Sequence, residues 1–395
     1  MRSCKMSVCQ GRGGLVKVLH ATNIVSHHQL PLARRIADLV GSENFRFVAT
    51  QPPSGERRRL GWTQDDDAPW ILRAGESSAD RDVAQRWWDE ADVVLCGERT
   101  LTQFRDRLHK GQLVFYMSER WWKPPIGMAR LLHPRFLSMA LAFRALASSP
   151  RFHFLAVGGF AASDMARWAP FPNRMWKWGY FSPEPGEDVM QDRDRNVFEI
   201  LWAGRMLHWK RVDTLLRGFS IVAHEAPSAH LTLVGSGPRE KSLRHLAARL
   251  GLRERVTFRP SVPAQEVRRF MQRAQVYVLP STGQEGWGAV LNEAMSEGCA
   301  VVASQQTGAA RSLLLDGENG WLFRAGDWQE LGHILCSIRA NPERRRAVAE
   351  AGRRTVIELW SSGTAASRFV AVCQALLVGS ELPFYCSGPM SKAGT

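Results

Sequence analysis

Two carboxylates stand eight residues apart in the stretch EGWGAVLNEAM. Glu285 lies among glycines, whereas Glu293 lies in an otherwise apolar run. Gly286 and Gly288 permit unusual backbone dihedrals and a close approach of the backbone to a ligand. A helix beginning near Gly288 would offer free N–H groups and a partial positive charge, which suit a phosphate. The helical rise separates the carboxylates by several ångströms, so we expect them to grip different parts of one elongated ligand.

Two cations follow an earlier apolar segment, FEILWA. Arg205 is expected at the end of that strand, and Lys210 at the start of the next helix. Arginine as a planar fork and lysine as a point charge are suited to holding a diphosphate. The glycine turn GSGP, which follows the next strand, allows a tight backbone turn near a ligand, although a simple connection between strand and helix explains it equally well.

Short apolar strands and amphipathic helical windows alternate over most of the chain and would position these residues. We expect strands at 16–22, 45–50, 92–96, 113–117, 152–157, 199–203, 230–234, 256–258, 276–279, 301–303 and 320–323. We expect helices at 30–40, 80–90, 213–224, 239–250, 264–273, 290–297 and 328–339. Such alternation predicts an α/β protein with parallel sheets covered on both faces. Ligands of open α/β sheets bind outside the carboxyl ends of the strands, where the residues above lie.

The number of units favours two doubly wound domains facing each other across a cleft. A stretch rich in Pro, Gly and charge, Phe181–Asn196, reads as the linker between them. The predicted domains are 1–182 and 196–378, followed by a tail, 379–395, whose end we expect to be disordered. An eight-fold barrel fits less well, because the units differ in length.

Composition limits the classes of function. The 395 residues are 45% apolar and carry a net charge of +14, which indicates a large core and an acidic partner. Seven scattered cysteines indicate reduced thiols. The N-terminus lacks the apolar region of a secretory signal, and we expect no membrane-spanning helix. A nucleic-acid binder is disfavoured, because zinc-finger and RNA-recognition signatures are missing.

The ordered set of motifs resembles retaining GT-B glycosyltransferases, most closely glycosyltransferase family 4, also called the glycosyl transferases group 1 family. The E-x7-E spacing is accompanied, in order along the chain, by AGRMLHWKR, LTLVGSGP, VTFRPSV and AQVYVLPS. The resemblance covers residues 198–323 strongly. It implies the GT-B fold, with two Rossmann-like domains and a last helix that packs back on the first domain. It also implies a nucleoside-diphosphate sugar as co-substrate, with no metal and no other cofactor.

The same resemblance implies roles for individual residues. Arg205 and Lys210 would neutralise the donor diphosphate, and Glu285 would contact hydroxyls of the transferred sugar, so these three form the catalytic set. Glu293 would bind the ribose hydroxyls. The full donor-binding set is Glu293, Gly286, Trp287, Gly288, Val290, Gly235 and Ser261, in which Trp287 stands where the family often has Phe.

The first half departs from the family pattern at two places. Relatives often carry paired glycines after the first strand, and this chain has none there. His27 and His28 would line the cleft instead, with a polar cap on the following helix as the alternative. Relatives often place a histidine after the strand that matches LVFYM, and this chain has Ser118, Glu119 and Arg120 there. Glu119 would contact the acceptor or the sugar, and a surface ion pair is the alternative interpretation. This departure leaves the donor and acceptor open.

The segment 119–151 is basic and rich in apolar residues. Trp121 and Trp122 lead it, Glu119 is its only acid, and its cations are Arg120, Lys123, Arg130, Arg135, Arg144 and Arg151. Cations with interfacial aromatics suit shallow attachment to anionic lipid, and a core helix with solvated arginines is the alternative. We therefore expect a cytoplasmic protein with peripheral contact to the inner face of the cytoplasmic membrane.

The predicted function is transfer of a hexose to a glycan, lipid-linked or small-molecule acceptor in the biosynthesis of cell-surface polysaccharide or glycoconjugate. A nucleotide-sugar epimerase or a sugar phosphorylase of the same fold is the alternative within the fold. A non-catalytic partner subunit is less consistent with the intact set of Arg205, Lys210, Glu285 and Glu293.

Overall fold

The computed structural model describes residues 16–59, 66–97, 101–169, 171–183 and 197–394, without the side chains of residues 56, 101 and 102. Most of the predicted linker and the first fifteen residues lie outside the described residues. Within them, no helix is both long enough and apolar enough to cross a bilayer.

The N-terminal domain is built on a seven-stranded sheet whose neighbouring strands are all parallel. In spatial order the strands are β3 (Ile71–Leu72), β2 (Phe45–Ala49), β1 (Val18–Thr22), β4 (Val93–Cys96), β5 (Leu113–Ser118), β6 (Phe152–Val157) and β7 (Met175–Trp178). The chain reverses its direction of travel across the sheet between β1 and β4. Such a switch point is where doubly wound sheets bind ligands.

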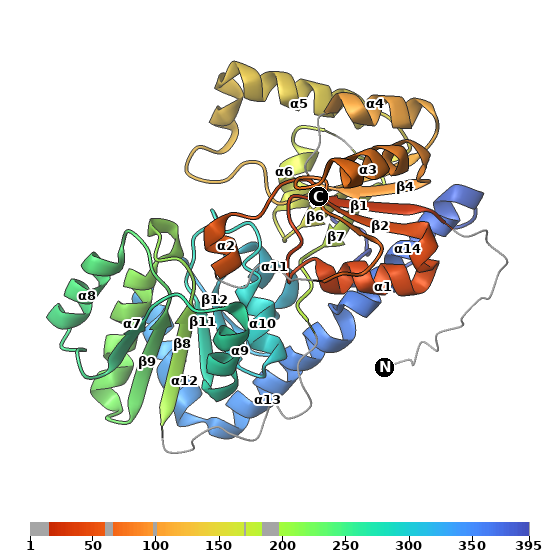
Figure 1. Ribbon diagram of the computed structural model, residues 1–395. Helices are drawn as coiled ribbons and strands as arrows, with labels where there is room; N and C mark the ends of the chain where they lie inside the picture. Colours follow the sequence, from red (N-terminus) through yellow and green to blue (C-terminus); the bar gives the residue numbers. More distant parts are fainter. Residues whose placement is uncertain (1–15, 60–65, 98–100, 170, 184–196, 395) are drawn as a thin grey trace.

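The C-terminal domain repeats this topology in a six-stranded parallel sheet. Its spatial order is β10 (Val256–Arg259), β9 (Ala229–Val234), β8 (Phe198–Ala203), β11 (Val276–Leu279), β12 (Ala300–Ser304) and β13 (Trp321–Phe323). The switch point lies between β8 and β11. The two sheets and their helices form the two lobes seen in Figure 1. This architecture confirms the predicted fold class.

Helices cover both sheets. In the N-terminal domain they are α1 (Leu30–Val40), η1 (Ser42–Asn44), α2 (Gly55–Arg59), α3 (Ser78–Glu90), α4 (Leu101–His109), η2 (Gly127–Leu132), α5 (Pro134–Leu146) and α6 (Ala161–Ala166). In the C-terminal domain they are η3 (His208–Lys210), α7 (Val212–Glu225), α8 (Glu240–Arg249), α9 (Ala264–Arg273), α10 (Val290–Ser296), α11 (Gly308–Leu313), α12 (Trp328–Ala340), α13 (Pro342–Arg354), η4 (Thr355–Leu359) and α14 (Ser362–Val378).

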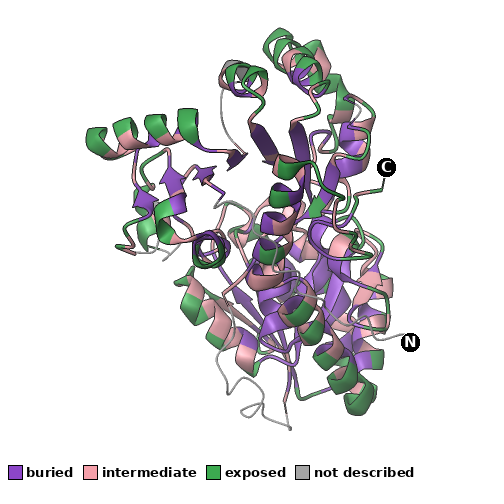
Figure 2. Ribbon diagram, turned by 90° about the vertical axis from the view of Figure 1, so that its right-hand side faces the viewer, coloured by how far each residue is buried: buried purple, intermediate pink, exposed green. Residues whose placement is uncertain are grey.

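The strands form the buried centre of each domain, as the purple ribbons in Figure 2 show. Every residue of β1, β4 and β6 is buried. Continuous apolar strands are expected for parallel sheets that helices cover on both faces. The rigid sheets thus hold the loops at their carboxyl ends in fixed positions.

The chain returns to the N-terminal domain at its end. Helix α14 packs against α1, its Phe369 ring contacts Phe115 on β5, and Arg151 donates a hydrogen bond of 2.9 Å to the Leu376 carbonyl oxygen. The last helix therefore belongs spatially to the first domain.

The tail was expected to be disordered, and the structure shows that this is wrong. Lys392 forms an antiparallel bridge with Trp176 on β7, and its ammonium lies 3.5 Å from the centre of the Trp176 ring. Met390 is fully buried. Backbone pairing with the edge strand β7 and burial of one large apolar side chain order a segment whose Gly, Ser and Pro content favours disorder.

Candidate active site

The site lies where the carboxyl ends of the two sheets face each other. The segment after β1 contributes His27 and His28, the segment after β8 contributes Arg205 and Lys210, and the loop after β11 contributes Glu285. These three segments flank the switch points of both sheets, so the topology brings them together from distant parts of the chain.

Lys210 and Glu285 form an ion pair between Nζ and Oε2. Their side chains are only 16% and 15% exposed, so the pair is held partly out of water. Glu285 is fixed from its own loop by a hydrogen bond from its N–H to the Thr282 carbonyl oxygen. This pair therefore places one cation and one carboxylate together at the carboxyl ends of β8 and β11.

Arg205 stands at the end of β8, directly after Gly204, and its side chain is exposed. Among the described residues, no ion pair joins Arg205 to a carboxylate. The predicted pair of cations therefore lies on one strand–helix connection, with Lys210 engaged and Arg205 open to solvent.

Glu293 lies on α10 and is buried, with Oε1 3.6 Å from His27 Nε2 and 3.5 Å from His28 Nδ1. Burial alone would raise the pKa of Glu293, but the hydrogen bond from His27 and the positive charges nearby, including Arg268, lower it below its usual value. Burial lowers the pKa of His28 to about 4, although the Glu293 carboxylate opposes this. At neutral pH, Glu293 is thus an ionised acceptor beside a neutral imidazole.

One cavity joins six of the predicted residues. It is lined by His27, His28, Gly235, Ser261, Val290 and Glu293, together with Gly204 at the end of β8. The cavity measures about 110 Å³, below the roughly 300–1,000 Å³ of typical ligand pockets. The cavity is therefore too small to enclose a whole nucleotide.

The only group of possible metal ligands found within the described residues is His27, His28 and Glu293, with the three ligand atoms within 4.8 Å of one another. Two imidazoles and a carboxylate form a ligand set that zinc accepts. The same atoms face the cavity beside Gly235 and Ser261, so they are equally placed to bind the hydroxyls of a nucleotide.

The loop after β11, residues 281–289, which we call the donor loop after its predicted role, contains the two predicted glycines, Gly286 and Gly288, and both are required by their surroundings. A Cβ on Gly286 would lie 2.0 Å from Glu119 Oε2, and Gly288 has a φ of +98°. A side chain at the first position would collide with the N-terminal domain, and a side chain at the second would be strained. Helix α10 then begins at Val290, the first residue of the helix predicted at 290–297.

Trp287 points away from the cavity and into the interdomain core. It is 1% exposed, donates from Nε1 to Asn292 Oδ1 at 3.1 Å, and its ring lies against Trp360 and the α-carbon of Gly179. Trp287 therefore holds the loop from behind, by packing.

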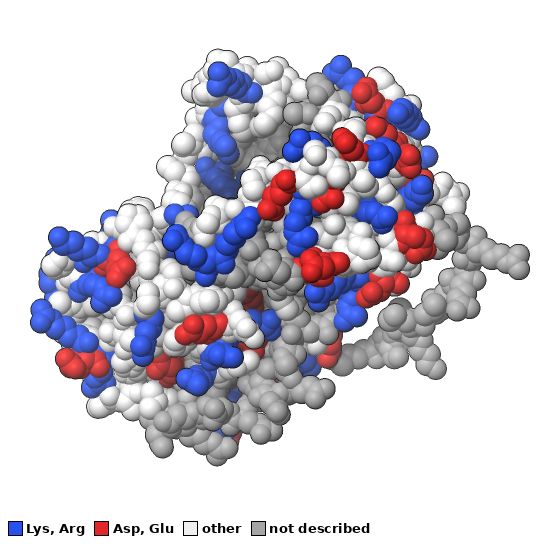
Figure 3. All heavy atoms as spheres, in the orientation of Figure 1, with Lys and Arg blue, Asp and Glu red and all other residues white. Residues whose placement is uncertain are grey.

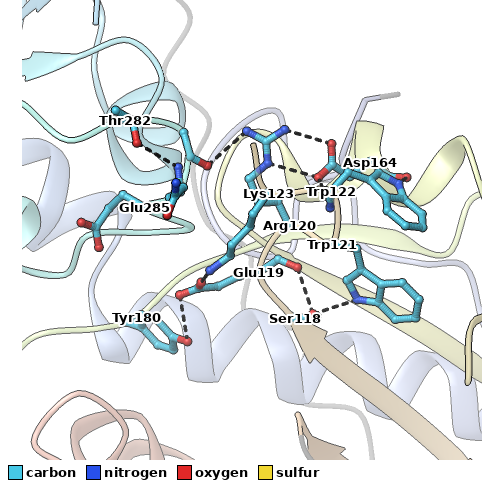
Figure 4. A network of polar contacts seen from close by, with 12 residues as sticks. Ser118, Glu119, Arg120, Trp121, Trp122, Lys123, Asp164, Tyr180, Thr282 and Glu285 are labelled. Atoms are coloured by element: carbon cyan, nitrogen blue, oxygen red, sulfur yellow. Dashed lines mark hydrogen bonds and ion pairs between the residues drawn. The ribbon is translucent and has the colours of Figure 1, made fainter. Parts of the chain in front are cut away.

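Glu119 lies at the other side of the cleft, in the network drawn in Figure 4. Its Oε2 accepts a bond of 2.7 Å from Lys123 Nζ, and Oε1 lies 3.5 Å from the Tyr180 hydroxyl. A second cavity of about 220 Å³ is lined by Glu119, Tyr180, Asn23, Ser118 and six other residues, of which five lie at the ends of β1, β4, β5 and β6 and one directly precedes α1. Glu119 is an ion-paired residue that also faces this acceptor-side cavity.

Several residues that hold the cleft were not predicted from the sequence. Arg120 forms a bidentate pair with the buried Asp164 and donates to the Gly283 carbonyl oxygen at 3.4 Å. Asn292 donates to the Tyr180 carbonyl oxygen and to Ser182 Oγ across the domain boundary. In the sequence, only their position beside a motif residue could have indicated Arg120 and Asn292, because their partners lie 44 to 163 residues away along the chain.

The interpretation of Trp121 and Trp122 as interfacial aromatics is wrong. They are 8% and 4% exposed, and Trp122 donates from Nε1 to the Asp164 carbonyl oxygen at 2.7 Å. Together they pack against Phe136 and, through Trp121, against Phe143. Apolar contacts on both rings make them part of the domain core.

Residues 190–355 match the family described as glycosyl transferases group 1. This segment of the chain is therefore similar to the group 1 domain of glycosyl transferases. This domain contains Lys210, Glu285 and Glu293, and it ends just before the helix that returns to the N-terminal domain.

Curated relatives of the group 1 domain include two named enzymes. The chain is 30% identical over 199 residues to a GDP-mannose-dependent α-(1-6)-phosphatidylinositol monomannoside mannosyltransferase of Mycolicibacterium smegmatis, covering 48% of this chain and 51% of the relative. It is 32% identical over 164 residues to a D-inositol 3-phosphate glycosyltransferase of Thermomonospora curvata, covering 39% and 38%. The chain thus spans about half the length, or less, of these relatives.

Solved structures extend the similarity of fold to both domains. A glycosyltransferase from Rickettsia africae aligns with a TM-score of 0.66 at 12% identity, covering 93% of this chain and all of the other. Anabaena HepE in complex with UDP aligns with a TM-score of 0.65 at 18% identity, covering 90% and 98%. Together with the two parallel sheets, these neighbours show the GT-B fold around the group 1 domain.

Proposed function

We propose that this chain is a retaining glycosyltransferase of family 4. It moves a sugar, a hexose in this proposal, from a nucleoside-diphosphate sugar to a hydroxyl of a glycan, lipid-linked or small-molecule acceptor. The observation that carries the proposal is the convergence, on one interdomain cleft, of the Lys210–Glu285 pair and the buried Glu293. Such a transfer belongs to the biosynthesis of cell-surface polysaccharide or glycoconjugate.

The related proteins support the choice of substrates. The M. smegmatis relative is named for GDP-mannose and a phosphatidylinositol monomannoside, and HepE was solved with UDP. A nucleoside diphosphate is the chemistry that these two names have in common. The donor base stays open between them.

Glu293 and its cavity provide the donor site in this proposal. The ionised carboxylate accepts hydrogen bonds, so it is suited to the two hydroxyls of a ribose. Gly235 and Ser261 line the same cavity and would lie against the nucleoside. The pair of histidines is then displaced from Glu293 or hydrogen-bonds to the nucleotide itself.

Lys210 and Arg205 provide charge stabilisation. When the bond between the anomeric carbon and the diphosphate oxygen breaks, negative charge develops on the leaving group, and fixed cations stabilise it without a metal ion. Glu285, released from Lys210, accepts from hydroxyls of the sugar. The acceptor oxygen bonds to the same face of the anomeric carbon, and its proton passes to the departing diphosphate, so configuration is retained.

Replacement of the cations tests this assignment. We expect Lys210→Ala and Arg205→Ala each to lower kcat on the order of 10²–10³-fold, as loss of one charge-stabilising donor does. Arg205 is exposed, so its removal leaves the fold intact. Lys241→Ala, an exposed lysine on α8, is the matched control and keeps full turnover.

A donor screen identifies the nucleotide and is needed before kinetics. UDP-, GDP-, ADP- and dTDP-sugars are compared by thermal shift, because a ligand that binds only the folded state raises the unfolding temperature. We expect one base to give a shift that Glu293→Gln reduces. If no sugar nucleotide shifts the protein, or if Lys210→Ala retains wild-type turnover, the proposal is wrong.

A further inference from the structure

A surface of η2 and α5 is apolar, and none of the residues that the structure describes covers it. Six of the ten exposed large apolar side chains in the described residues lie there, on 16 consecutive positions: Ile126, Met128, Leu132, Leu137, Met139 and Leu141. Leu132 is 85% exposed and Ile126 is 61% exposed. Single exposed apolar residues need no explanation, but a concentration of this kind marks an interaction site. We call these six residues the η2–α5 surface.

The inner face of α5 already supplies its packing. Phe143 and Ala140 are fully buried, and Phe143 lies 4.8 Å from Trp121 and 5.3 Å from Phe152 between ring centres. Leu137 and Leu141, one helical turn apart, lie on the opposite, exposed face. The helix is therefore apolar on the face that contacts the core and again on the face that contacts solvent, which an ordinary surface helix is not.

Charge identifies the partner. Between Glu119 and Asp164 the sequence contains no acidic residue, whereas Arg130, Arg135 and Arg144 are exposed among the apolar side chains. Figure 3 shows only blue and white spheres over η2 and the start of α5. The surface is cationic and apolar at once, which matches an anionic lipid interface and would repel a second copy of itself.

Two of the arginines are held in place. Arg130 donates to the Trp121 carbonyl oxygen at 2.9 Å, with its guanidinium 4.6 Å from the centre of the Phe136 ring. Arg144 donates to the Trp168 carbonyl oxygen at 3.0 Å. Backbone anchoring fixes both guanidinium groups at the surface, so little side-chain entropy is lost when they meet lipid phosphates.

We propose that the η2–α5 surface docks on an anionic lipid bilayer, with the apolar side chains of Ile126 and Leu132 inserted and the arginines on the phosphates. Lys123 and Pro124 connect it to the cleft, since Lys123 pairs with Glu119 and a Cβ on Gly283 of the donor loop would lie 3.1 Å from Pro124 Cγ. Docking thus places the acceptor-side cavity beside the membrane. The proposal does not depend on transferase activity.

Flotation tests the proposal with the full chain. Vesicles of phosphatidylcholine with phosphatidylglycerol are compared with vesicles of phosphatidylcholine alone, at low and high salt. We expect the protein to float with the anionic vesicles at low salt only, because screening weakens the attraction. Arg135→Gln should lower the partition coefficient roughly fivefold, the expected effect of one cation near an anionic surface.

Matched variants separate this surface from general stickiness. Leu132→Asp combined with Ile126→Asp should abolish flotation while the unfolding temperature and nucleotide binding stay unchanged, because both side chains are exposed. Leu315→Asp combined with Val378→Asp adds the same charge at residues that are also 61% and 68% exposed, and keeps flotation. The proposal is overturned if the protein ignores anionic vesicles at low salt, if both double variants behave alike, or if light scattering shows a dimer that Leu132→Asp dissociates.

Discussion

At the scale of single residues, each carboxylate of the cleft has a basic side chain beside it. The pairs are Glu285 with Lys210, Glu293 with His27 and His28, Glu119 with Lys123, and Asp164 with Arg120. A buried carboxylate without such a partner would be costly. The hydroxyls and phosphates of a substrate can therefore replace these partners, so that binding leaves no buried charge without a partner.

The fit between Gly179 and Trp287 gives a prediction at the same scale. A Cβ on Gly179 would lie 2.5 Å from Trp287 Cη2, so we expect Gly179→Ala to lower the free energy of unfolding by about 1–3 kcal/mol through overpacking. In a Trp287→Phe background that ring edge is gone, and Gly179→Ala should cost less by about 1 kcal/mol or more. Urea unfolding of the wild type, Gly179→Ala, Trp287→Phe and the double variant measures the coupling free energy between the two residues. Additive losses would show that the two residues do not share this contact.

The sequence predicted which residues lie together at the cleft better than it predicted how they are arranged. The glycines around Glu285 and the eight-residue spacing to Glu293 pointed to these two residues, because both features can be read from a short stretch of sequence. The partner of Glu293 and the inward direction of Trp287 depend on how the domains meet, which no local pattern encodes. The same limit explains why Trp121 and Trp122 were misread, since their contacts with Phe136 require the fold of the whole segment.

At the scale of elements, the regular strands and helices were predictable and the marginal ones were not. Helix α1 and strand β11 have the predicted bounds, because their apolar spacing is complete within the element. The edge strand β3 has two residues, and β7 reads MWKW, so neither shows a clear run of apolar residues. Strands of this kind are defined by their neighbours in the sheet, as β3 is by its pairing with β2.

Two central strands carry histidines that make the N-terminal domain sensitive to acid. Burial lowers the pKa of His20 on β1 and of His153 on β6 to about 3, against about 6.5 in an unfolded chain. Below pH 6.5 the unfolded chain binds protons that the native protein does not. As the pH is lowered below 6.5, the free energy of unfolding should therefore decrease, by up to about 1.4 kcal/mol per pH unit for each histidine.

Urea unfolding between pH 5 and 7 checks this prediction, since most carboxylates do not titrate there. The His153→Phe variant is the control: it keeps a ring between Phe115 and Trp176 and cannot titrate, so the slope should decrease by about one histidine. An unchanged slope would show that His153 is protonated in the native protein as readily as in the unfolded chain. Loss of the bond from Trp176 Nε1 shifts stability by a constant and leaves the slope unaffected.

At the scale of the whole molecule, the two domains are packed as one body. A single core cluster runs from Val18 on β1 through Trp178 and Trp287 to Leu279 on β11. Gly159 donates to the Gly308 carbonyl oxygen at 3.1 Å, and a Cβ on Gly158 would lie 2.4 Å from the Gly286 carbonyl oxygen. Glycines thus let the two domains approach at the donor loop, where any opening for a substrate must begin.

Helix α14 lies in the C-terminal half of the sequence but packs on the N-terminal domain, so its loss should destabilise that domain first. Phe369 is fully buried, with ring centres 5.0 Å from Phe115 and 6.0 Å from Trp178. Phe369→Ala should lower the free energy of unfolding by about 3–5 kcal/mol, as large core truncations do. Hydrogen exchange should then show lost protection in β5 and β7 before β8 and β9, whereas the exposed Gln374→Ala changes neither. Protection lost first in β8 and β9 would mean that α14 stabilises the C-terminal domain instead.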